Sequence, residues 1–261
     1  MHLFNASSMI TEESIKEVIK IIDEPEKLEK RIIEAKMLLL QQYHLKVYNL
    51  PEDFTTKSYV IASNHLTDSD APLFMSYYYE IMHAVKSSYP ELFVFAKENC
   101  FNGVSIPKEL SPILKHETVF SVDRGKAGGA VDAMRAAREW FQEGEQPKHF
   151  LIFAQGTIYD INKEKAEDIE KGVFWLAKVL GIPVLPAFIE QAIEGEENRI
   201  IFDEPIVIPK NCRDFEEYKQ LWIDRVIKAQ NRLVELTGIP ARKTVLDAEH
   251  QVRKRFKTTE K

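Results

Sequence analysis

The stretch Tyr59–Asp70, with the sequence YVIASNHLTDSD, decides the fold. It begins with four apolar residues, a run typical of a buried strand. Polar residues follow at once, among them Asn64, His65 and Asp70, and the next segment, Ala71–His83, has a helical pattern. A strand that leads through a polar turn into a helix predicts an α/β unit, and ligands of such sheets bind where the strands end.

The same alternation of short apolar segments and helical segments continues along the chain. Further strands are predicted at Leu92–Ala96, Thr118–Val122, Phe150–Phe153, Val184–Ile189 and Arg199–Phe202, and helices at Gly129–Gly144, Lys163–Leu180 and Asp214–Thr237. This order predicts an α/β fold, a three-layer domain with a mixed, mostly parallel sheet.

The pattern divides the chain into three parts. Residues 1–45 are predicted to form an N-terminal helical pair, residues 46–240 the α/β domain, and residues 241–261 a basic tail. From residue 242 onward the tail has seven basic and three acidic side chains. The helical pair either covers the sheet or forms a small platform that faces a membrane.

Composition excludes several classes of protein. The chain has 261 residues, of which 44% are hydrophobic and 29% are charged, as in an ordinary globular protein. A net charge of −6 argues against a dedicated nucleic-acid binder. The two cysteines, Cys100 and Cys212, lack the spacing of zinc ligands and suit a reducing cytosol. We therefore expect no metal site.

Targeting signals are also missing from the sequence. The first residues lack the basic start and apolar core of a signal peptide, and no apolar run approaches the ~18 residues of a membrane span. We expect a cytoplasmic protein that is either peripheral at a membrane surface or acts on an acceptor soluble enough to need no membrane.

His65 and Asp70 are the side chains of the opening stretch that can carry out acid–base chemistry. A carboxylate that accepts one imidazole N–H fixes the tautomer, so that the other ring nitrogen can take a proton from a hydroxyl. The substrate's own hydroxyl is then the nucleophile. Two alternatives stay open: Asp68 as the partner in place of Asp70, and a purely structural His65 that caps the next helix.

Three more segments at strand ends carry residues suited to a ligand. Val122–Arg124 ends in an arginine, which suits an anionic group. Phe153–Thr157 contains Gly156, which allows close backbone approach, and a threonine that adds hydroxyl and amide donors. Ile182–Pro186 enters another strand.

Taken in order, these motifs give the chain a resemblance to a known family. It resembles the glycerolipid acyltransferases, which include glycerol-3-phosphate and lysophosphatidate acyltransferases, over residues 46–210. The family's N-H-x-x-x-x-D motif is matched by Asn64, His65 and Asp70. Its later motifs, an Asp-Arg step, F-P-E-G-T-R and V-P-x-x-P, correspond to Val122–Arg124, Phe153–Ile158 and Ile182–Pro186.

The resemblance implies an O-acyltransferase of phospholipid biosynthesis. A fatty acyl group would pass from acyl-CoA or acyl carrier protein, a thioester co-substrate rather than a bound cofactor, to a hydroxyl of a lysophospholipid or glycerophosphate-like acceptor. His65 would be the general base and Asp70 would orient it. Arg124 would bind an acceptor phosphate. The substrate-binding residues that the resemblance implies are Asn64, Lys97, Arg124, Gln155, Gly156 and Thr157.

The third motif departs from the family at two charged positions. Gln155 stands where the family has glutamate, and Ile158 where it has arginine. Isoleucine cannot make the guanidinium–phosphate contact. Either another cation, such as Lys97, Lys126 or Lys171, replaces the arginine, or the acceptor is not phosphorylated. A non-catalytic acyl-lipid binding protein and a thioester hydrolase are further alternatives.

Aromatic side chains give two smaller predictions. The run Tyr77–Tyr79 either lines an acyl groove or packs on the sheet. Trp140, Trp175 and Trp222 lie in helical patterns and are predicted to be core residues.

Overall fold

A computed structural model describes the central part of the chain. The described residues are 45–66, 70, 74, 75, 78, 91–97, 119–122, 128–190 and 198–241. The predicted helical pair and the basic tail therefore lie outside the described residues, apart from Leu45 and Ala241, and the three-part division stays a prediction.

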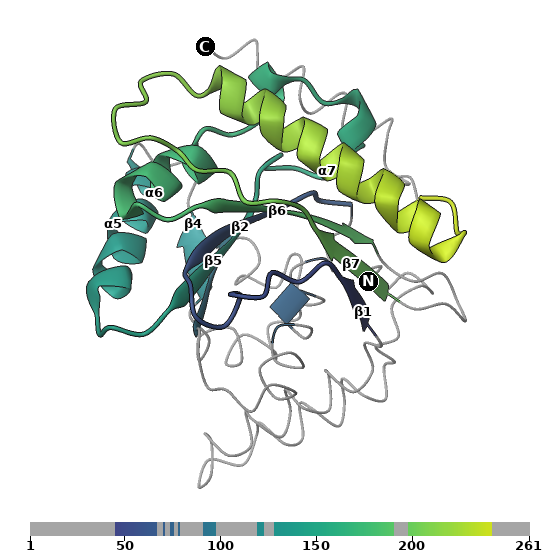
Figure 1. Ribbon diagram of the computed structural model, residues 1–261. Helices are drawn as coiled ribbons and strands as arrows, with labels where there is room; N and C mark the ends of the chain where they lie inside the picture. Colours follow the sequence, from purple (N-terminus) through teal and green to yellow (C-terminus); the bar gives the residue numbers. More distant parts are fainter. Residues whose placement is uncertain are drawn as a thin grey trace, which may run out of the picture.

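A seven-stranded sheet lies at the centre of the described part (Figure 1). The strands are β1 (Leu45–Tyr48), β2 (Tyr59–Ser63), β3 (Glu91–Lys97), β4 (Val119–Val122), β5 (Lys148–Phe153), β6 (Val184–Glu190) and β7 (Asn198–Phe202). Their order across the sheet is β1-β7-β6-β2-β5-β3-β4. Strand β7 runs antiparallel to β6, and every other neighbouring pair is parallel. The predicted mixed, mostly parallel sheet is confirmed.

Three described α-helices cover one face of this sheet (Figure 1). They are α5 (Gly129–Gln142), α6 (Gly172–Leu180) and α7 (Glu216–Thr237), and the short 3-10 helices η4 (Ile161–Lys163) and η5 (Ala166–Asp168) contact α7. None of the described helices is long and apolar enough to cross a bilayer.

The central strand β2 is buried on both faces, which explains its uninterrupted apolar sequence. Successive side chains of a strand point to opposite faces. Val60 and Ala62 pack in the core beneath the helices, whereas Tyr59 and Ile61 pack on the other face. Aromatic side chains including Tyr78 fill that second core, so the packing alternative is the one observed for Tyr78. With helical residues on both faces of the sheet, the three-layer arrangement is also confirmed.

One predicted helix is only partly correct. The segment Lys163–Leu180 was expected to be a single helix, but α6 begins at Gly172. Upstream, carboxylates of Asp160 and Asp168 accept hydrogen bonds from nearby backbone N–H groups and stabilise short 3-10 turns instead. At Gly172 a Cβ atom would lie 3.1 Å from Met134 Cε, so the glycine permits the close approach of α6 to α5.

Of the three tryptophans predicted to be core residues, two pack in or against the core and one does not. Trp222 is completely buried and its indole N–H donates to the Ala62 carbonyl, and Trp140 packs against the core as predicted. The prediction for Trp175 is wrong, because 42% of its surface is exposed on the outer face of α6.

A histidine inside the second core makes stability sensitive to acid. His149 on β5 is fully buried, its ring centroid lies 4.4 Å from that of Phe54, and its Nε2 lies 2.9 Å from the Lys57 carbonyl oxygen. Burial disfavours the imidazolium and lowers the pKa of His149 from 6.5 to about 3.

The free energy of unfolding is therefore expected to fall as the pH drops from about 6.5 toward 3. In this range the unfolded chain binds a proton at His149 that the folded chain does not, which costs up to about 1.4 kcal/mol per pH unit. Urea unfolding at several pH values measures the slope. His149→Phe should remove this part of the slope, and an unchanged slope would contradict the assignment.

Candidate active site

The described residues of the first and third motifs gather at the carboxyl edge of the parallel strands. Strand β2 lies between β5 and β6 and runs parallel to both. Asn64 and His65 leave β2 at the edge where the turn Ala154–Thr157 leaves β5. The first and third motifs, about ninety residues apart in the sequence, are thereby neighbours.

His65 and Asp70 form the expected side-chain pair. Nδ1 of His65 lies 2.9 Å from Oδ2 of Asp70, and the same oxygen accepts the Leu66 N–H at 2.6 Å. The Asp70 side chain is completely buried, while 16% of the His65 side chain is exposed. A buried carboxylate thus orients a histidine that is still accessible. Asp68, the alternative partner, lies outside the described residues.

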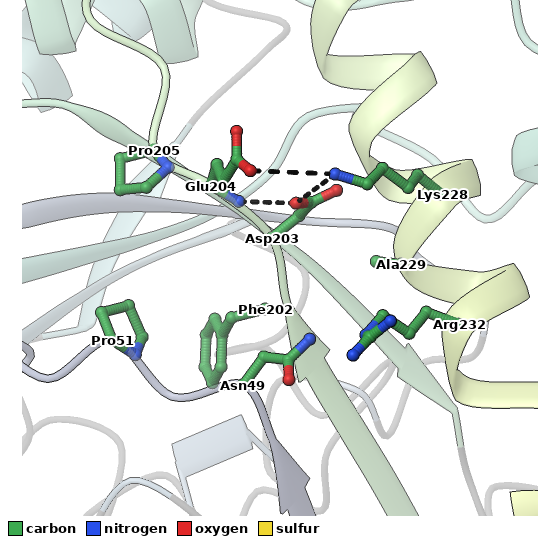
Figure 2. Close-up of a pocket in the computed structure, with 9 residues that line it drawn as sticks. All are labelled: Asn49, Pro51, Phe202, Asp203, Glu204, Pro205, Lys228, Ala229 and Arg232. Atoms are coloured by element: carbon green, nitrogen blue, oxygen red, sulfur yellow. Dashed lines mark hydrogen bonds and ion pairs between the residues drawn. The ribbon is translucent and has the colours of Figure 1, made fainter. Parts of the chain in front are cut away.

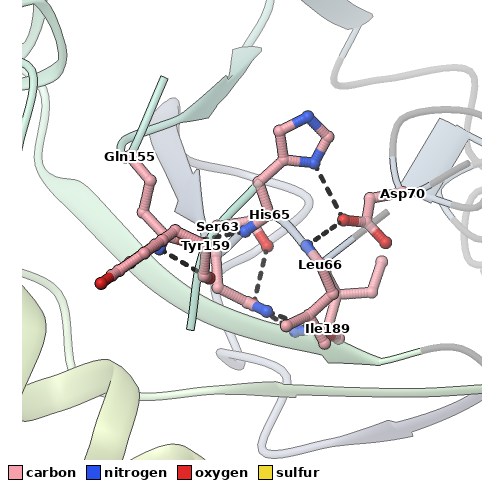
Figure 3. A network of polar contacts seen from close by, with 8 residues as sticks. Ser63, His65, Leu66, Asp70, Gln155, Tyr159 and Ile189 are labelled. Atoms are coloured by element: carbon pink, nitrogen blue, oxygen red, sulfur yellow. Dashed lines mark hydrogen bonds and ion pairs between the residues drawn. The ribbon is translucent and has the colours of Figure 1, made fainter. Parts of the chain in front are cut away.

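The second ring nitrogen of His65 points away from Asp70 (Figure 3). Because Nδ1 faces a carboxylate, we place its proton there, and Nε2 then carries the lone pair that can accept a proton. The ring also stacks on Phe153, with 4.3 Å between ring centroids and 20° between planes. The orientation of the imidazole is therefore fixed from two sides.

The main chain of His65 is held by the turn after β5. Its N–H donates to Gln155 Oε1 at 2.8 Å, and its carbonyl oxygen accepts from the Tyr159 N–H at 3.1 Å (Figure 3). Nε2 of Gln155 donates to the Tyr159 carbonyl and to Glu164 Oε1, both at 2.9 Å. Backbone and ring of the histidine are thus both held by groups of the protein itself.

Asn64 connects the end of β2 to the end of β6. Its side chain is fully buried, donates to the Ile189 carbonyl at 3.0 Å and accepts from the Ile189 N–H at 2.7 Å. Glu190, which follows Ile189 at the end of β6, forms a buried ion pair with Arg199 of β7. The predicted contact of Asn64 with substrate stays a prediction, and the observed contacts join two strands.

The turn of the third motif has a defined geometry. Gly156 is buried, has a φ of 64°, which favours glycine, and its N–H donates to the Phe153 carbonyl at 2.9 Å. Thr157 is partly exposed beside it. Ile158 is only 5% exposed, so the position where the family has arginine faces the interior.

The predicted cations are only partly placed. Lys97 is the last residue of β3, which is separated from β2 by β5, and its side chain is not among those described. Arg124 and Lys126 lie outside the described residues, and Lys171 is exposed just before α6. Their proposed contacts with an acceptor therefore remain predictions. Among the described side chains, no group of three His, Cys, Asp or Glu residues could hold a metal ion.

A pocket of about 420 Å³ lies elsewhere, between α7 and the end of β7 (Figure 2). Strand β6 lies between β7 and β2, and the residues that line the pocket include none of the predicted site residues. Lys228 in its wall pairs with Asp203 at 3.4 Å and with Glu204 at 4.0 Å. The pocket is thus separate from the histidine site.

Sequence reasoning missed three contributors to the site. Phe153 stacks on His65, Tyr159 binds it through main-chain atoms, and Glu164 holds the amide of Gln155. The main-chain contacts leave no residue-type signal, and Glu164 lies in the segment Lys163–Leu180, which the sequence predicted as one helix but in which α6 begins only at Gly172. The Phe153 contact depends on the register of β2 with β5.

The fold and site define an α/β protein whose histidine, at a strand end, is oriented by a buried carboxylate, the arrangement of general-base enzymes. A family model described as Acyltransferase matches residues 44–190, more than half of the chain. The chain belongs to this acyltransferase family.

The chain is similar in fold to the crystal structure of the 1-acyl-sn-glycerophosphate (LPA) acyltransferase PlsC from Thermotoga maritima, with a TM-score of 0.52 and 18% identity. The similarity covers 88% of this chain and 89% of that one. No curated protein sequence matches.

Proposed function

We propose that the protein transfers a fatty acyl group from a thioester, acyl-CoA or acyl carrier protein, to a hydroxyl of a lysophospholipid or glycerophosphate-like acceptor. The observation that carries this proposal is the His65–Asp70 pair, in which a buried carboxylate orients an accessible imidazole. Membership of the acyltransferase family supports the reaction type. The acceptor class rests on the resemblance of the motifs.

The proposed reaction needs no covalent acyl-enzyme. Nε2 of His65 takes the proton of the acceptor hydroxyl as its oxygen attacks the thioester carbonyl carbon. The new C–O bond gives a tetrahedral intermediate, whose collapse breaks the C–S bond. The thiolate leaves and takes the proton from His65, so the base is restored. The Asp70 carboxylate stabilises the imidazolium during the intermediate.

The turn after β5 is the proposed site of oxyanion stabilisation. Acyl transfer is accelerated by donors aimed at the developing oxyanion. Because the Gly156 N–H already donates to Phe153, we assign to Gly156 the shaping of the turn and to Thr157 the proposed donor role.

A non-phosphorylated acceptor is the second candidate. Ile158 is buried, so the third motif supplies no cation at that position for a phosphate. A non-phosphorylated acceptor would need none. In either case we propose that the enzyme works in the cytoplasm, in peripheral contact with a membrane when its acceptor is membrane-bound.

Product analysis tests this proposal. Purified full-length protein is given an acyl-CoA or acyl carrier protein thioester with lysophosphatidate, glycerol 3-phosphate or a monoacylglycerol, and products are identified by mass spectrometry alongside thiol release. An acylated phosphorylated product is expected. Acylation of the monoacylglycerol alone would favour the second candidate. Thiol release without an acylated acceptor, or saturable thioester binding without turnover on any acceptor, would overturn acyl transfer.

A further inference from the structure

A buried link joins Gln155 to Glu164 behind the histidine. Gln155 is 2% exposed and Glu164 is 8% exposed. The amide nitrogen of Gln155 donates one hydrogen to the Tyr159 carbonyl and one to the Glu164 carboxylate, both at 2.9 Å. Its oxygen accepts the His65 N–H at 2.8 Å. The orientation of the amide is unambiguous, because acceptors surround the nitrogen and a donor faces the oxygen.

We propose that the Gln155–Glu164 link is a positioning device for His65, and that Glu164 requires glutamine at position 155. The inference rests on the proposed function. Neither side chain need touch substrate: Gln155 acts through the main chain of His65, and Glu164 acts through Gln155.

The negative charge of Glu164 explains why glutamine, rather than glutamate, is favoured at position 155. A glutamate at 155 could still accept the His65 N–H, but it would have no hydrogens for the Tyr159 carbonyl or for Glu164. Two carboxylates would then meet about 2.9 Å apart in a buried place, where like charges strongly disfavour each other. The acidic side chain that the family has at this motif position is thus incompatible with Glu164.

The segment around Glu164 is held in place by its own hydrogen bonds and by packing in the core, so Glu164 is a fixed partner for Gln155. Asp160 caps η4 by accepting the Asn162 N–H at 3.0 Å, and the Glu164 N–H donates to the Ile161 carbonyl at 3.2 Å. Ile161 is 1% exposed in the core beneath α7. The link therefore connects the packed η4 turn to the backbone of the proposed base.

Loss of the link is expected to affect the rate constant more than substrate binding. Gln155→Glu should lower kcat by about 10- to 100-fold, because a base displaced by about 1 Å loses up to 10²-fold in rate. The KM for the thioester should change by less than about threefold, because neither side chain contacts the donor in this proposal. Glu164→Gln keeps a hydrogen-bond acceptor for Gln155 and should lower kcat less than Gln155→Glu does.

The double variant decides whether the charges cause the loss. Gln155→Glu combined with Glu164→Gln restores one amide–carboxylate contact and should regain at least half of the lost activity on a logarithmic scale. Glu167→Gln, an exposed acid on η5, is the matched control and should leave kcat unchanged. If Gln155→Glu alone does not fold, the double variant should fold and be active. A fully active Gln155→Glu, or a double variant that is no better, overturns the proposal.

Hydrogen exchange separates this inference from the proposed function. Exchange of the amides of residues 63–66, followed by mass spectrometry, should be faster in Gln155→Glu than in the unchanged protein and slower again in the double variant. If exchange is faster in Gln155→Glu but the unchanged protein transfers no acyl group, the positioning role of the link is supported and the proposed function is refuted. Unaltered exchange together with unaltered transfer would refute the link alone.

Discussion

His65→Gln is expected to lower acyl transfer by about 10²–10⁴-fold, the usual contribution of a general base. Glutamine occupies similar space but cannot accept a proton at neutral pH. The fold should persist, because the side chain of His65 is 16% exposed and its place at the strand end is held by main-chain contacts. Initial rates of thiol release, with the acceptor that product analysis identifies, measure kcat/KM, and thermal unfolding reports on folding.

A companion variant sharpens this test. His65→Ala leaves a space beside Phe153 into which imidazole added to the buffer can bind, so partial recovery of activity with imidazole is expected. The control is the same addition to the unchanged protein, which should show no gain. Full transfer activity in His65→Gln would remove His65 from the role of base.

Asp70→Asn is expected to lower kcat for acyl transfer by about 10²–10⁴-fold, with little effect on substrate binding. Replacing the orienting aspartate of a catalytic triad by asparagine costs about 10⁴-fold because the histidine takes the wrong tautomer. The same reasoning applies here, because Oδ2 of Asp70 lies at hydrogen-bond distance from His65 Nδ1 and accepts a hydrogen bond from the Leu66 N–H. An amide NH₂ in that place would move the imidazole proton to Nε2 and block proton transfer.

The double variant of His65→Gln and Asp70→Asn tests whether the two residues work as a unit. Groups that act together are strongly non-additive, so the double variant should be about as slow as His65→Gln alone. Losses that multiply would show that Asp70 acts independently of His65. Circular dichroism of all three variants is the control for folding, because Asp70 also fixes the Leu66 backbone.

The strands and the central pair were predictable from sequence for a physical reason. A strand buried on both faces is a continuous apolar run, and the site residues of an α/β sheet follow directly after such runs. β2 and β6 are of this kind, with every residue buried, and His65 and Asp70 are close in sequence. These features are local, so a single sequence contains them.

The features that were missed depend on contacts between distant or irregular parts. Strand β1 was not predicted, because its four residues, with the charged Lys46, become a strand only by pairing with β7. Trp175 has a helical pattern, but which face of α6 meets the core is decided by tertiary packing. Gln155 and Glu164 meet across irregular turns where no periodicity brings them together.

The hydrogen bonds of the Asn64 amide bear on how the acceptor of such an enzyme can change during evolution while the position of His65 is kept. By pairing with both backbone groups of Ile189, it adds one more rung between β2 and β6, and His65 is the first residue beyond that rung. The position of His65, the proposed base, is thus set by the sheet rather than by a surface loop. If the proposed function holds, changes in the segments that bind the acceptor would alter which hydroxyl is acylated, while the proposed base keeps its position at the end of β2.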